Sequence, residues 1–362
     1  MAKSTVIPFG PQHPVLPEPI HLDLEIEDEI VKRAIPQIGF IHRGLEKLVE
    51  HNDYNQFVYI AERACGICSM GHALGYSMAV EKLLNVEIPQ RAEFLRAIWH
   101  ELSRMHSHIM WLGLCADAFG FESLFMHSWR IREKILEIFE ITTGARIIFG
   151  AIIPGGVSRD ISNAVLSDIK TTLNDLKLEY NKICKSFLND SSIKNRTVDV
   201  GKITHKQALD LSMVGPFARA SGVNWDVRNL KSGAYSSLED FEPVIDNQGD
   251  CYSRIKVRCA EVYQSIDIIC ELINKIPDGD VLNKINKLTP EDEISSILIE
   301  QPRGEAYYFV KGNGTKFLDR FRLRTPTSQN LSGLIEALKG CSLSDVNMII
   351  LTIDPCISCT ER

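Results

Sequence analysis

The stretch Phe94-Leu95-Arg96-Ala97-Ile98-Trp99-His100-Glu101-Leu102-Ser103-Arg104-Met105-His106-Ser107-His108-Ile109 indicates the fold class of this 362-residue chain. Its apolar side chains recur every three or four residues, which predicts an amphipathic helix from about residue 90. The same periodicity, with capping and turn signals, predicts more helices. They are expected at about 124–150, from a Ser158 cap to about 188, and at 204–214, 251–275 and 328–339.

Shorter β elements are expected at both ends of the chain. Residues 20–27 alternate strictly between apolar and polar side chains, which predicts a half-buried strand. The proline-rich segment 8–14 before it is typical of an extended arm or turn. Segment 276–300 is polar and is interpreted as a connector, whereas 301–323 predicts a small sheet.

These patterns together predict a mainly α fold with small β elements (α+β). It has a central helical bundle, an N-terminal β-hairpin or arm and a buried C-terminus. We expect one domain over 1–362. It comprises an extended or β region (1–40), a helical body (41–275) and a mixed C-terminal region (276–362) that closes the site.

Charge and hydropathy exclude some classes of protein. The net charge of −7 and the lack of a basic stripe argue against nucleic-acid binding. No apolar run reaches the roughly 18–20 residues that span a bilayer. The first ten residues lack the pattern of a signal peptide. We therefore expect an intracellular protein that reaches a membrane only through partners.

Four of the ten cysteines form two Cys-x-x-Cys pairs, one near each end. One lies in Arg63-Ala64-Cys65-Gly66-Ile67-Cys68-Ser69-Met70-Gly71-His72, and the other in Asp354-Pro355-Cys356-Ile357-Ser358-Cys359-Thr360-Glu361-Arg362. Four soft thiolates suit zinc, iron–sulfur or another thiophilic metal. A zinc ribbon places its pairs about 15–20 residues apart, far closer than these. A zinc that closes the fold and a binuclear centre both remain open at this point.

Both cysteine motifs resemble those of the [NiFe]-hydrogenase large subunit. Its N-terminal signature is Arg-x-Cys-Gly-x-Cys-x-x-x-His, and its C-terminal one is Asp-Pro-Cys-x-x-Cys-x-x-[His/Arg]. The resemblance implies a nickel–iron centre whose iron carries two cyanides and one carbonyl. It also implies that Cys65 and Cys356 are terminal nickel ligands, and that Cys68 and Cys359 bridge nickel and iron.

Further site residues follow from the same resemblance. They are Glu46, Arg303, Cys356 and Asp354 as catalytic groups, and His72, Pro326 and Thr327 in the pocket of the cofactor. Glu46 is expected beside Cys356 as a proton relay, with a pKa raised by burial. Arg303 is expected over the open coordination site with Asp354 as its partner. On the residues alone, an exposed carboxylate at Glu46 and a surface ion pair at Arg303 are the alternatives.

Several other segments resemble the quinone-site large subunit of respiratory complex I. They are 10–14, 41–47, 143–146, 154–157 and 220–226. That subunit lacks the nickel cysteines, all four of which are present here. Similarity to both groups indicates a membrane-bound, energy-converting (Ech-type) hydrogenase that reduces protons to dihydrogen reversibly.

The subgroup implies the partners of the chain. They are a small electron-transfer subunit with a [4Fe–4S] cluster, ferredoxin-like and complex I-like subunits, integral-membrane ion-translocating subunits, and reduced ferredoxin as electron donor. The complex is expected on the cytoplasmic side of the cell membrane. Arg362 replaces a histidine that often binds magnesium, which argues against a magnesium site. The alternatives are a complex I-like, non-catalytic subunit with structural zinc, and a hydrogenase linked to carbon monoxide or formate.

Overall fold

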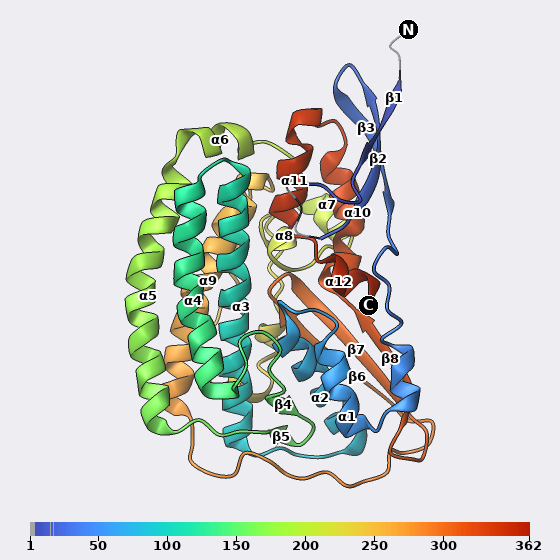
Figure 1. The fold of residues 1–362 in the computed structure, drawn as a ribbon, viewed down its shortest axis with the longest axis vertical. Coiled ribbons are helices and arrows are strands. Elements are labelled where there is room, and N and C mark those ends of the chain that lie inside the picture. The colour runs from blue at the N-terminus through green and yellow to red at the C-terminus, as the bar shows by residue number, and fades with distance from the viewer. Residues whose placement is uncertain (1–3, 15, 17) are drawn as a thin grey trace.

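A bundle of long helices forms one side of the molecule (Figure 1). The computed structural model describes residues 4–14, 16 and 18–362. The bundle consists of α3 (Gln90–Ala118), α4 (Glu122–Thr143), α5 (Asn163–Asn189) and α9 (Cys251–Lys275). The apolar stripe of α3 is buried, because α4 and α9 both pack against this helix. The expected α+β class with a helical bundle is confirmed.

Shorter helices surround the bundle and the sheets. They are η1 (Lys47–His51), α1 (Tyr54–Glu62), α2 (Ser69–Leu84), α6 (Ser191–Thr197), α7 (His205–Asp210), α8 (Gly215–Arg219), η2 (Val227–Leu230), η3 (Gly233–Ser237), α10 (Pro326–Leu338), η4 (Leu343–Asp345), α11 (Val346–Ile353) and α12 (Ile357–Glu361). The predicted bounds of α9 are confirmed, and α10 begins two residues earlier than predicted. Helix α7 begins at a capping box made by Thr204 and Gln207, but it ends at Asp210, whereas the prediction extended to 214.

The predicted end of α4 and the predicted start of α5 are also wrong. Helix α4 ends at Thr143, because Gly144 adopts a left-handed conformation (φ 83°) that ends the helix. Helix α5 begins after Ser162, whose side chain accepts a hydrogen bond from the amide of Val165. Ser158 is not the cap, since its hydroxyl donates to the carbonyl of Gly150 (2.9 Å).

The N-terminal region forms an antiparallel sheet of β1 (Thr5–Phe9), β2 (His21–Glu27) and β3 (Ile30–Gln37). The predicted strand at 20–27 is therefore confirmed as β2. Its inward side chains Leu22 and Leu24 are buried, and strand β3 contacts helix α10. This sheet projects beyond the rest of the molecule near the N-terminus (Figure 1).

The second sheet is a meander of β6 (Ile294–Gln301), β7 (Gly304–Gly312) and β8 (Leu318–Arg324). The prediction of a sheet at 301–323 is correct, but the connector assigned to 276–300 is wrong at its end. Strand β6 starts at Ile294 and escaped prediction because Ser295 and Ser296 interrupt the apolar residues of its first half. Its last residues are buried, and β6 contacts helix α2. The turn at Pro154-Gly155 joins β4 (Ile152–Ile153) to β5 (Gly156–Val157).

The C-terminal segment lies in the interior of the structure. Helices α11 and α12 are almost entirely buried, which confirms the expected buried C-terminus. The C-terminus lies between the two larger sheets (Figure 1). Within the described ranges, the helices are all too short or too polar to cross a bilayer.

Candidate metal centre

The four motif cysteines meet in one buried cluster. Cys65 and Cys68 lie just before α2, and Cys356 and Cys359 lie at the start of α12 and within it. Each side chain is at most 3% exposed. The sulfurs of Cys65 and Cys356 are 3.4 Å apart, and those of Cys68 and Cys359 are 3.3 Å apart. Tertiary structure therefore combines one cysteine from each motif in each pair.

This cluster fits a thiophilic metal. Two sulfurs that share one metal at about 2.3 Å lie roughly 3.8 Å apart, close to the separation within each pair. Hydrogen bonding from Cys356 and Cys359 holds the pKa of the Cys68 thiol well below its ordinary value, whereas hydrogen bonding with Cys356 and burial raise that of Cys359 well above it. Metal ions bound here would supply the positive charge that allows all four cysteines to lose their protons and act as thiolate ligands.

His72 contacts the pair formed by Cys68 and Cys359. Its Nε2 lies 3.4 Å from the Cys68 sulfur and 3.3 Å from the Cys359 sulfur. Its Nδ1 lies 2.9 Å from the hydroxyl of Tyr308. We assign the proton to Nε2, because sulfur anions accept and the Tyr308 hydroxyl can donate to Nδ1. His72 therefore stabilises negative charge on these two sulfurs.

Arg303 and Asp354 form a buried pair beside the cluster. The Arg303 guanidinium donates through Nη2 to Oδ1 of Asp354 (2.8 Å) and through Nε to its carbonyl (2.9 Å). Burial opposes the charge of Arg303, but Asp354 and the nearby sulfurs outweigh it and raise the Arg303 pKa well above its ordinary value. Arg303 also lines a small cavity together with Cys68 and Cys359. A fixed positive charge thus faces the space beside the sulfurs.

Pro326 and Thr327 line the same cavity from the first turn of α10. The hydroxyl of Thr327 accepts a hydrogen bond from the amide of Cys356 (3.0 Å). Thr327 therefore orients the second cysteine motif as well as bordering the cavity.

The hydrogen bonds of Glu46 come from β8 and from the end of the chain, so its position beside Cys356 stays a prediction. Its carboxylate accepts from Nη1 of Arg322 (2.8 Å), from Nε of Arg362 (2.9 Å) and from the amide of Leu323 (3.0 Å). Burial raises the pKa of Glu46, but the Leu323 amide and the two arginines outweigh it and leave the pKa below its ordinary value. The environment expected for a proton relay is therefore not present at Glu46.

The carboxylate beside Cys356 belongs to Glu18, which the sequence analysis missed. Its Oε1 lies 3.9 Å from the Cys356 sulfur, and its Oε2 accepts from the amides of Ile357 and Ser358. The Glu18 carboxylate thus accepts hydrogen bonds from amides at the start of α12 that have no partner within the helix. The local sequence Leu16-Pro17-Glu18-Pro19 carries no periodic signal, so only the fold reveals this contact.

Segment 39–46 connects both cysteine motifs. Arg43 donates to the carbonyls of Arg63 and Ala64 (both 2.8 Å), just before Cys65, and to that of Ser358 (3.1 Å). The carboxylate of Glu361 accepts from the amides at positions 39 and 41. A lone basic residue some twenty positions before a motif is a weak signal, and this role escaped prediction.

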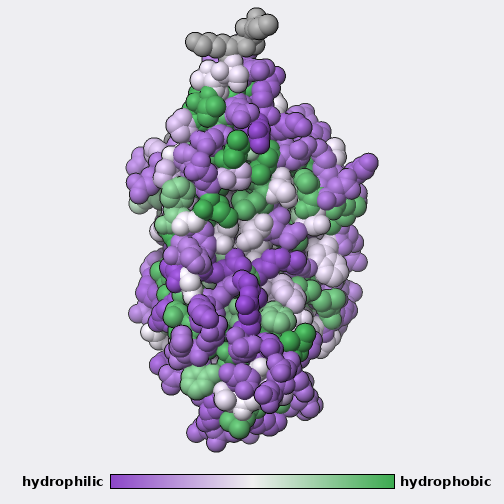
Figure 2. Space-filling view, turned by 90° about the vertical axis from the view of Figure 1, so that its right-hand side faces the viewer, coloured by the Kyte–Doolittle hydropathy of each residue, from purple (hydrophilic) through white to green (hydrophobic). Residues whose placement is uncertain are grey.

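The residues around Glu46 do not fit a magnesium ion. Both carboxylate oxygens already accept from arginines, and Arg362 places a guanidinium where the related motif has a metal-binding histidine. Magnesium would have to displace these two cations. Hydrophilic residues cover the middle of the right-hand side of the molecule as drawn in Figure 1, which Figure 2 shows face-on. The surface pocket here is lined by Glu46, Arg322 and Arg362 among others.

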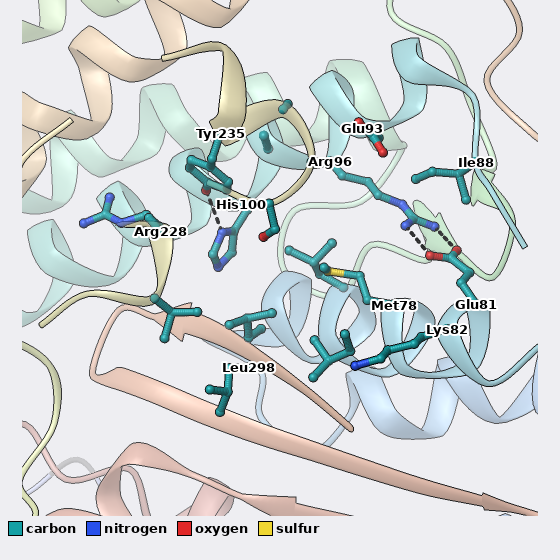
Figure 3. Close-up of a pocket in the computed structure, with 18 of the residues that line it drawn as sticks. Met78, Glu81, Lys82, Ile88, Glu93, Arg96, His100, Arg228, Tyr235 and Leu298 are labelled. Carbon is teal, nitrogen blue, oxygen red and sulfur yellow. Dashed lines mark hydrogen bonds and ion pairs between the residues drawn. The ribbon is translucent and has the colours of Figure 1, made fainter. Parts of the chain in front are cut away.

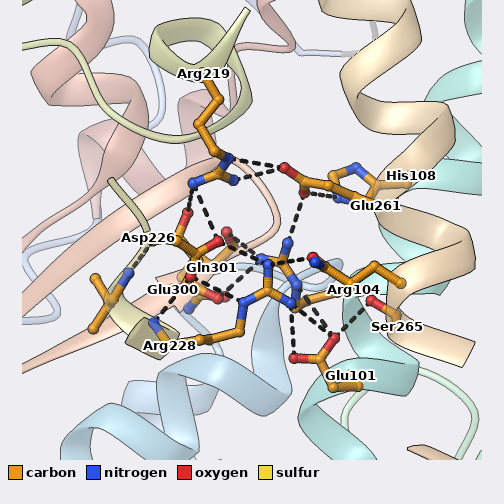
Figure 4. A network of polar contacts seen from close by, with 12 residues as sticks. Glu101, Arg104, His108, Arg219, Asp226, Arg228, Glu261, Ser265, Glu300 and Gln301 are labelled. Carbon is orange, nitrogen blue, oxygen red and sulfur yellow. Dashed lines mark hydrogen bonds and ion pairs between the residues drawn. The ribbon is translucent and has the colours of Figure 1, made fainter. Parts of the chain in front are cut away.

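A buried network of charges holds the strand that leads to Arg303 (Figure 4). Its members are Glu101, Arg104, Arg219, Asp226, Arg228, Glu261 and Glu300, all at most 4% exposed. Arg104 donates through Nη1 to the carbonyls of Glu300 (3.1 Å) and Gln301 (3.0 Å), and through Nη2 to Glu261 (2.6 Å). These bonds fix the end of β6, two residues before Arg303.

The network contains four carboxylates and three arginines, so one negative charge is in excess. Glu300 is the carboxyl that takes up a proton most easily. Burial and the nearby Asp226 raise its pKa to about 7, although Arg219 donates to it at 2.7 Å. The pKa of His108, which contacts Glu261, falls to about 4 because it is buried, so this ring is neutral at pH 7.

Fold and site together define a class of protein, and sequence comparison agrees with it. The family model "Nickel-dependent hydrogenase" matches residues 43–115. The model "Respiratory-chain NADH dehydrogenase, 49 Kd subunit" matches residues 118–297 and 287–362. The chain belongs to the family that comprises the complex I 49-kDa subunit and the [NiFe]-hydrogenase large subunit. It is the large subunit of an energy-converting hydrogenase or of a complex I-like enzyme.

Relatives from both branches are similar over nearly the whole chain. The membrane-bound hydrogenase subunit alpha of Pyrococcus furiosus is 34% identical over 98% of this chain and 87% of its own length. The carbon monoxide-induced hydrogenase of Rhodospirillum rubrum is 34% identical, with 98% and 99% covered. An NADH-quinone oxidoreductase subunit of Rickettsia akari is also 34% identical, with 97% of each covered. Overall sequence identity therefore does not assign the chain to the hydrogenase branch or to the complex I branch. The residues of the site have to distinguish them.

Proposed function

We propose that this chain is the catalytic subunit of a membrane-bound, energy-converting [NiFe]-hydrogenase that reversibly reduces protons to dihydrogen. The supporting observation is that all four motif sulfurs converge in one buried cluster beside Arg303. A nickel–iron centre with cyanide and carbonyl ligands, when bound there, supplies the redox chemistry of the H–H bond. In this proposal Cys65, Cys68, Cys356 and Cys359 would hold that centre, Cys65 and Cys356 as ligands of nickel alone and Cys68 and Cys359 as ligands of both metals.

The residues around the sulfur cluster position a positive charge and determine where a proton binds. Arg303 keeps a guanidinium at the cavity where a small ligand enters, and Asp354 holds that group in position. Pro326 and Thr327 border the same space. His72 donates toward Cys68 and Cys359 and stabilises negative charge on these two sulfurs. In this proposal Cys356, of the other pair, holds the proton.

Glu18 is the first proton relay in this proposal. The thiol of Cys356 holds the proton, and the Glu18 carboxylate 3.9 Å away accepts it. Glu18 is only partly buried, so it can exchange that proton with the surroundings. The reverse path delivers protons for the formation of dihydrogen. General acid–base groups act over such short distances once they close to hydrogen-bond range.

We propose that electrons come from reduced ferredoxin through partner subunits with [4Fe–4S] clusters. Among the described residues, the group close enough together to hold a metal consists of Cys65, Cys68 and Cys359, so we place the iron–sulfur clusters on partners. Ion-translocating membrane subunits would couple turnover to transport on the cytoplasmic side of the membrane. The Pyrococcus relative is named as membrane-bound, which supports this arrangement. The Rhodospirillum relative makes carbon monoxide-linked electron supply the second candidate.

Metal analysis of the purified complex tests the proposal. We expect one nickel per chain, together with infrared bands of iron-bound carbonyl and cyanide. Full occupancy by zinc without those bands would contradict the proposal and favour the complex I-like, non-catalytic alternative. Dihydrogen production from reduced ferredoxin, compared with production from carbon monoxide in the same membranes, distinguishes the two electron donors.

A further inference from the structure

A chain of hydrogen bonds leads from the sulfur cluster into the layer between α2 and the second sheet. It starts at Nε2 of His72, which contacts the sulfurs of Cys68 and Cys359. The other ring nitrogen, Nδ1, lies 2.9 Å from the hydroxyl of Tyr308 on β7. Nε2 of Gln301, at the end of β6, lies 3.1 Å from the same hydroxyl. The histidine, tyrosine and glutamine side chains are each at most 2% exposed.

Two glycines on α2 allow Tyr308 and Gln301 to approach this helix so closely. A Cβ atom at Gly75 would lie 2.3 Å from Cε2 of Tyr308, and one at Gly71 would lie 2.3 Å from Oε1 of Gln301. Both separations are far shorter than ordinary van der Waals contact. A larger residue at either position would therefore displace the side chain that lies against it. Because these glycines flank His72 along the helix, the notch that they form places the Tyr308 hydroxyl at the imidazole.

Tyr308 lies apart from the larger cavity that α2 also borders. That cavity, of about 500 Å³, lies between α2, α3, β6 and the η2–η3 segment, and Leu74 and Met78 contribute to its wall (Figure 3). Tyr308 lines neither this cavity nor the small one at the sulfurs. Its hydroxyl is therefore enclosed by protein, with His72 and Gln301 in range and the Gly71 carbonyl farther away, at 3.5 Å.

The cysteine sulfurs determine the direction of donation along this chain. A thiolate that binds a metal carries no proton and can only accept, so Nε2 of His72 donates to it. Nδ1 of the neutral ring is then an acceptor, and the Tyr308 hydroxyl donates to it. The Tyr308 oxygen in turn accepts from Nε2 of Gln301. Burial raises the pKa of Tyr308 well above its ordinary value, so the hydroxyl keeps the proton that it donates.

This direction of donation affects the electron density on the sulfurs. Hydrogen bonds in a buried chain polarise and strengthen one another. Donation from Tyr308 to Nδ1 makes the Nε2–H group of His72 a stronger donor and fixes the plane of the ring. Hydrogen bonds to the sulfur ligands of a metal are one of the means by which a protein sets its reduction potential. Because they withdraw electron density from the metal, they raise that potential.

We propose that Tyr308 is a positioning residue for the metal centre. Its hydroxyl holds His72 with Nε2–H directed at the sulfurs of Cys68 and Cys359, and so raises the reduction potential of the metals bound there. This inference rests on the proposed function, because it requires a redox-active centre at the motif cysteines. Tyr308 acts on that centre through His72.

Tyr308→Phe in the intact complex tests this inference, because it removes one hydroxyl and keeps the ring. We expect the infrared bands of the iron-bound carbonyl and cyanides to move to lower frequency and the midpoint potential of the metal centre to fall. Nickel per chain should stay unchanged. The matched control is Tyr76→Phe, on α2, which removes a buried hydroxyl that donates to the Tyr54 carbonyl (2.9 Å). Neither the bands nor the potential should move in this control.

Two results with these variants would overturn the inference. Unchanged bands and potential in Tyr308→Phe at full nickel occupancy would show that the hydroxyl does not act on the centre. Equal shifts in Tyr76→Phe would show a general effect of losing a buried hydroxyl. Failure of the proposed function is distinguishable from both, since the carbonyl and cyanide bands would then be absent from the unmodified complex.

Pulsed electron paramagnetic resonance of the nickel signal in the unmodified complex decides the direction of donation even where a variant fails to fold. We expect coupling to one nitrogen, together with a proton that exchanges in heavy water, as an Nε2–H group on a sulfur ligand predicts. A coupled nitrogen without an exchangeable proton would place the proton of His72 on Nδ1 and overturn the inference.

Discussion

Oε1 of Glu18 lies 3.9 Å from the sulfur of Cys356, although 338 positions separate the two residues in the chain. The same carboxylate accepts hydrogen bonds from the first amides of α12. Glu18 thus both orients the C-terminal cysteine motif and lies within reach of a proton on its first sulfur.

Glu18→Gln should reduce dihydrogen production by about 100-fold or more, the usual contribution of a general acid–base group. The amide still accepts hydrogen bonds but does not relay a proton, so metal content should stay unchanged. Dihydrogen production and nickel per chain are the two measurements. Glu25→Gln, on strand β2, is the matched control. A near-normal rate in Glu18→Gln would remove this residue from the proton path.

Glu46→Gln should act on the C-terminal segment instead of on proton transfer. The variant weakens the ion pairs with Arg322 and Arg362, which anchor the end of the chain. We expect nickel content and activity to fall together, so that activity per bound nickel stays close to normal. Full nickel occupancy together with a loss of turnover would contradict this prediction and would indicate that Glu46 takes part in proton transfer.

Arg43→Gln should loosen the contact between the two cysteine motifs, because one amide replaces a guanidinium that contacts three carbonyls. We expect lower nickel occupancy and faster proteolysis of the C-terminal segment. Arg33→Gln, at an exposed position on β3, serves as the control. Normal occupancy and proteolysis in Arg43→Gln would show that the contact is dispensable.

Arg303→Met should lower the free energy of unfolding by about 3–5 kcal/mol, because Asp354 is left buried without its partner. Adding Asp354→Asn removes the unpaired charge, so the double variant should recover part of this loss. Denaturant unfolding of the metal-free chain measures both effects. Additive losses in the double variant would mean that the two residues do not stabilise each other.

The stability of the chain should also depend on pH through Glu300. Its folded pKa is raised to about 7, so its contribution is present at pH 4 and is lost as the pH rises through 7. Glu300→Gln should therefore unfold at a higher temperature than the unmodified chain at pH 8, with little or no advantage at pH 5. Thermal unfolding at both values checks this. An equal difference at both pH values would exclude titration of Glu300 as the cause.

Several features were determined by the sequence alone. Apolar periodicity predicted α3 and α9, and alternation predicted β2, because each pattern reflects which face of an element is buried. The two Cys-x-x-Cys motifs indicated a metal site through the chemistry of sulfur. Their flanking residues indicated the family. Strand β6 was partly missed, since two adjacent serines interrupt the apolar residues of its first half.

Only the tertiary structure decided which carboxylate lies beside Cys356. Glu46 stands in a recognisable motif, and two arginines from distant segments form ion pairs with its carboxylate. Glu18 stands in a segment without periodicity, and the fold brings it to the amides of α12. Such contacts arise from the packing of remote segments, which no local pattern encodes.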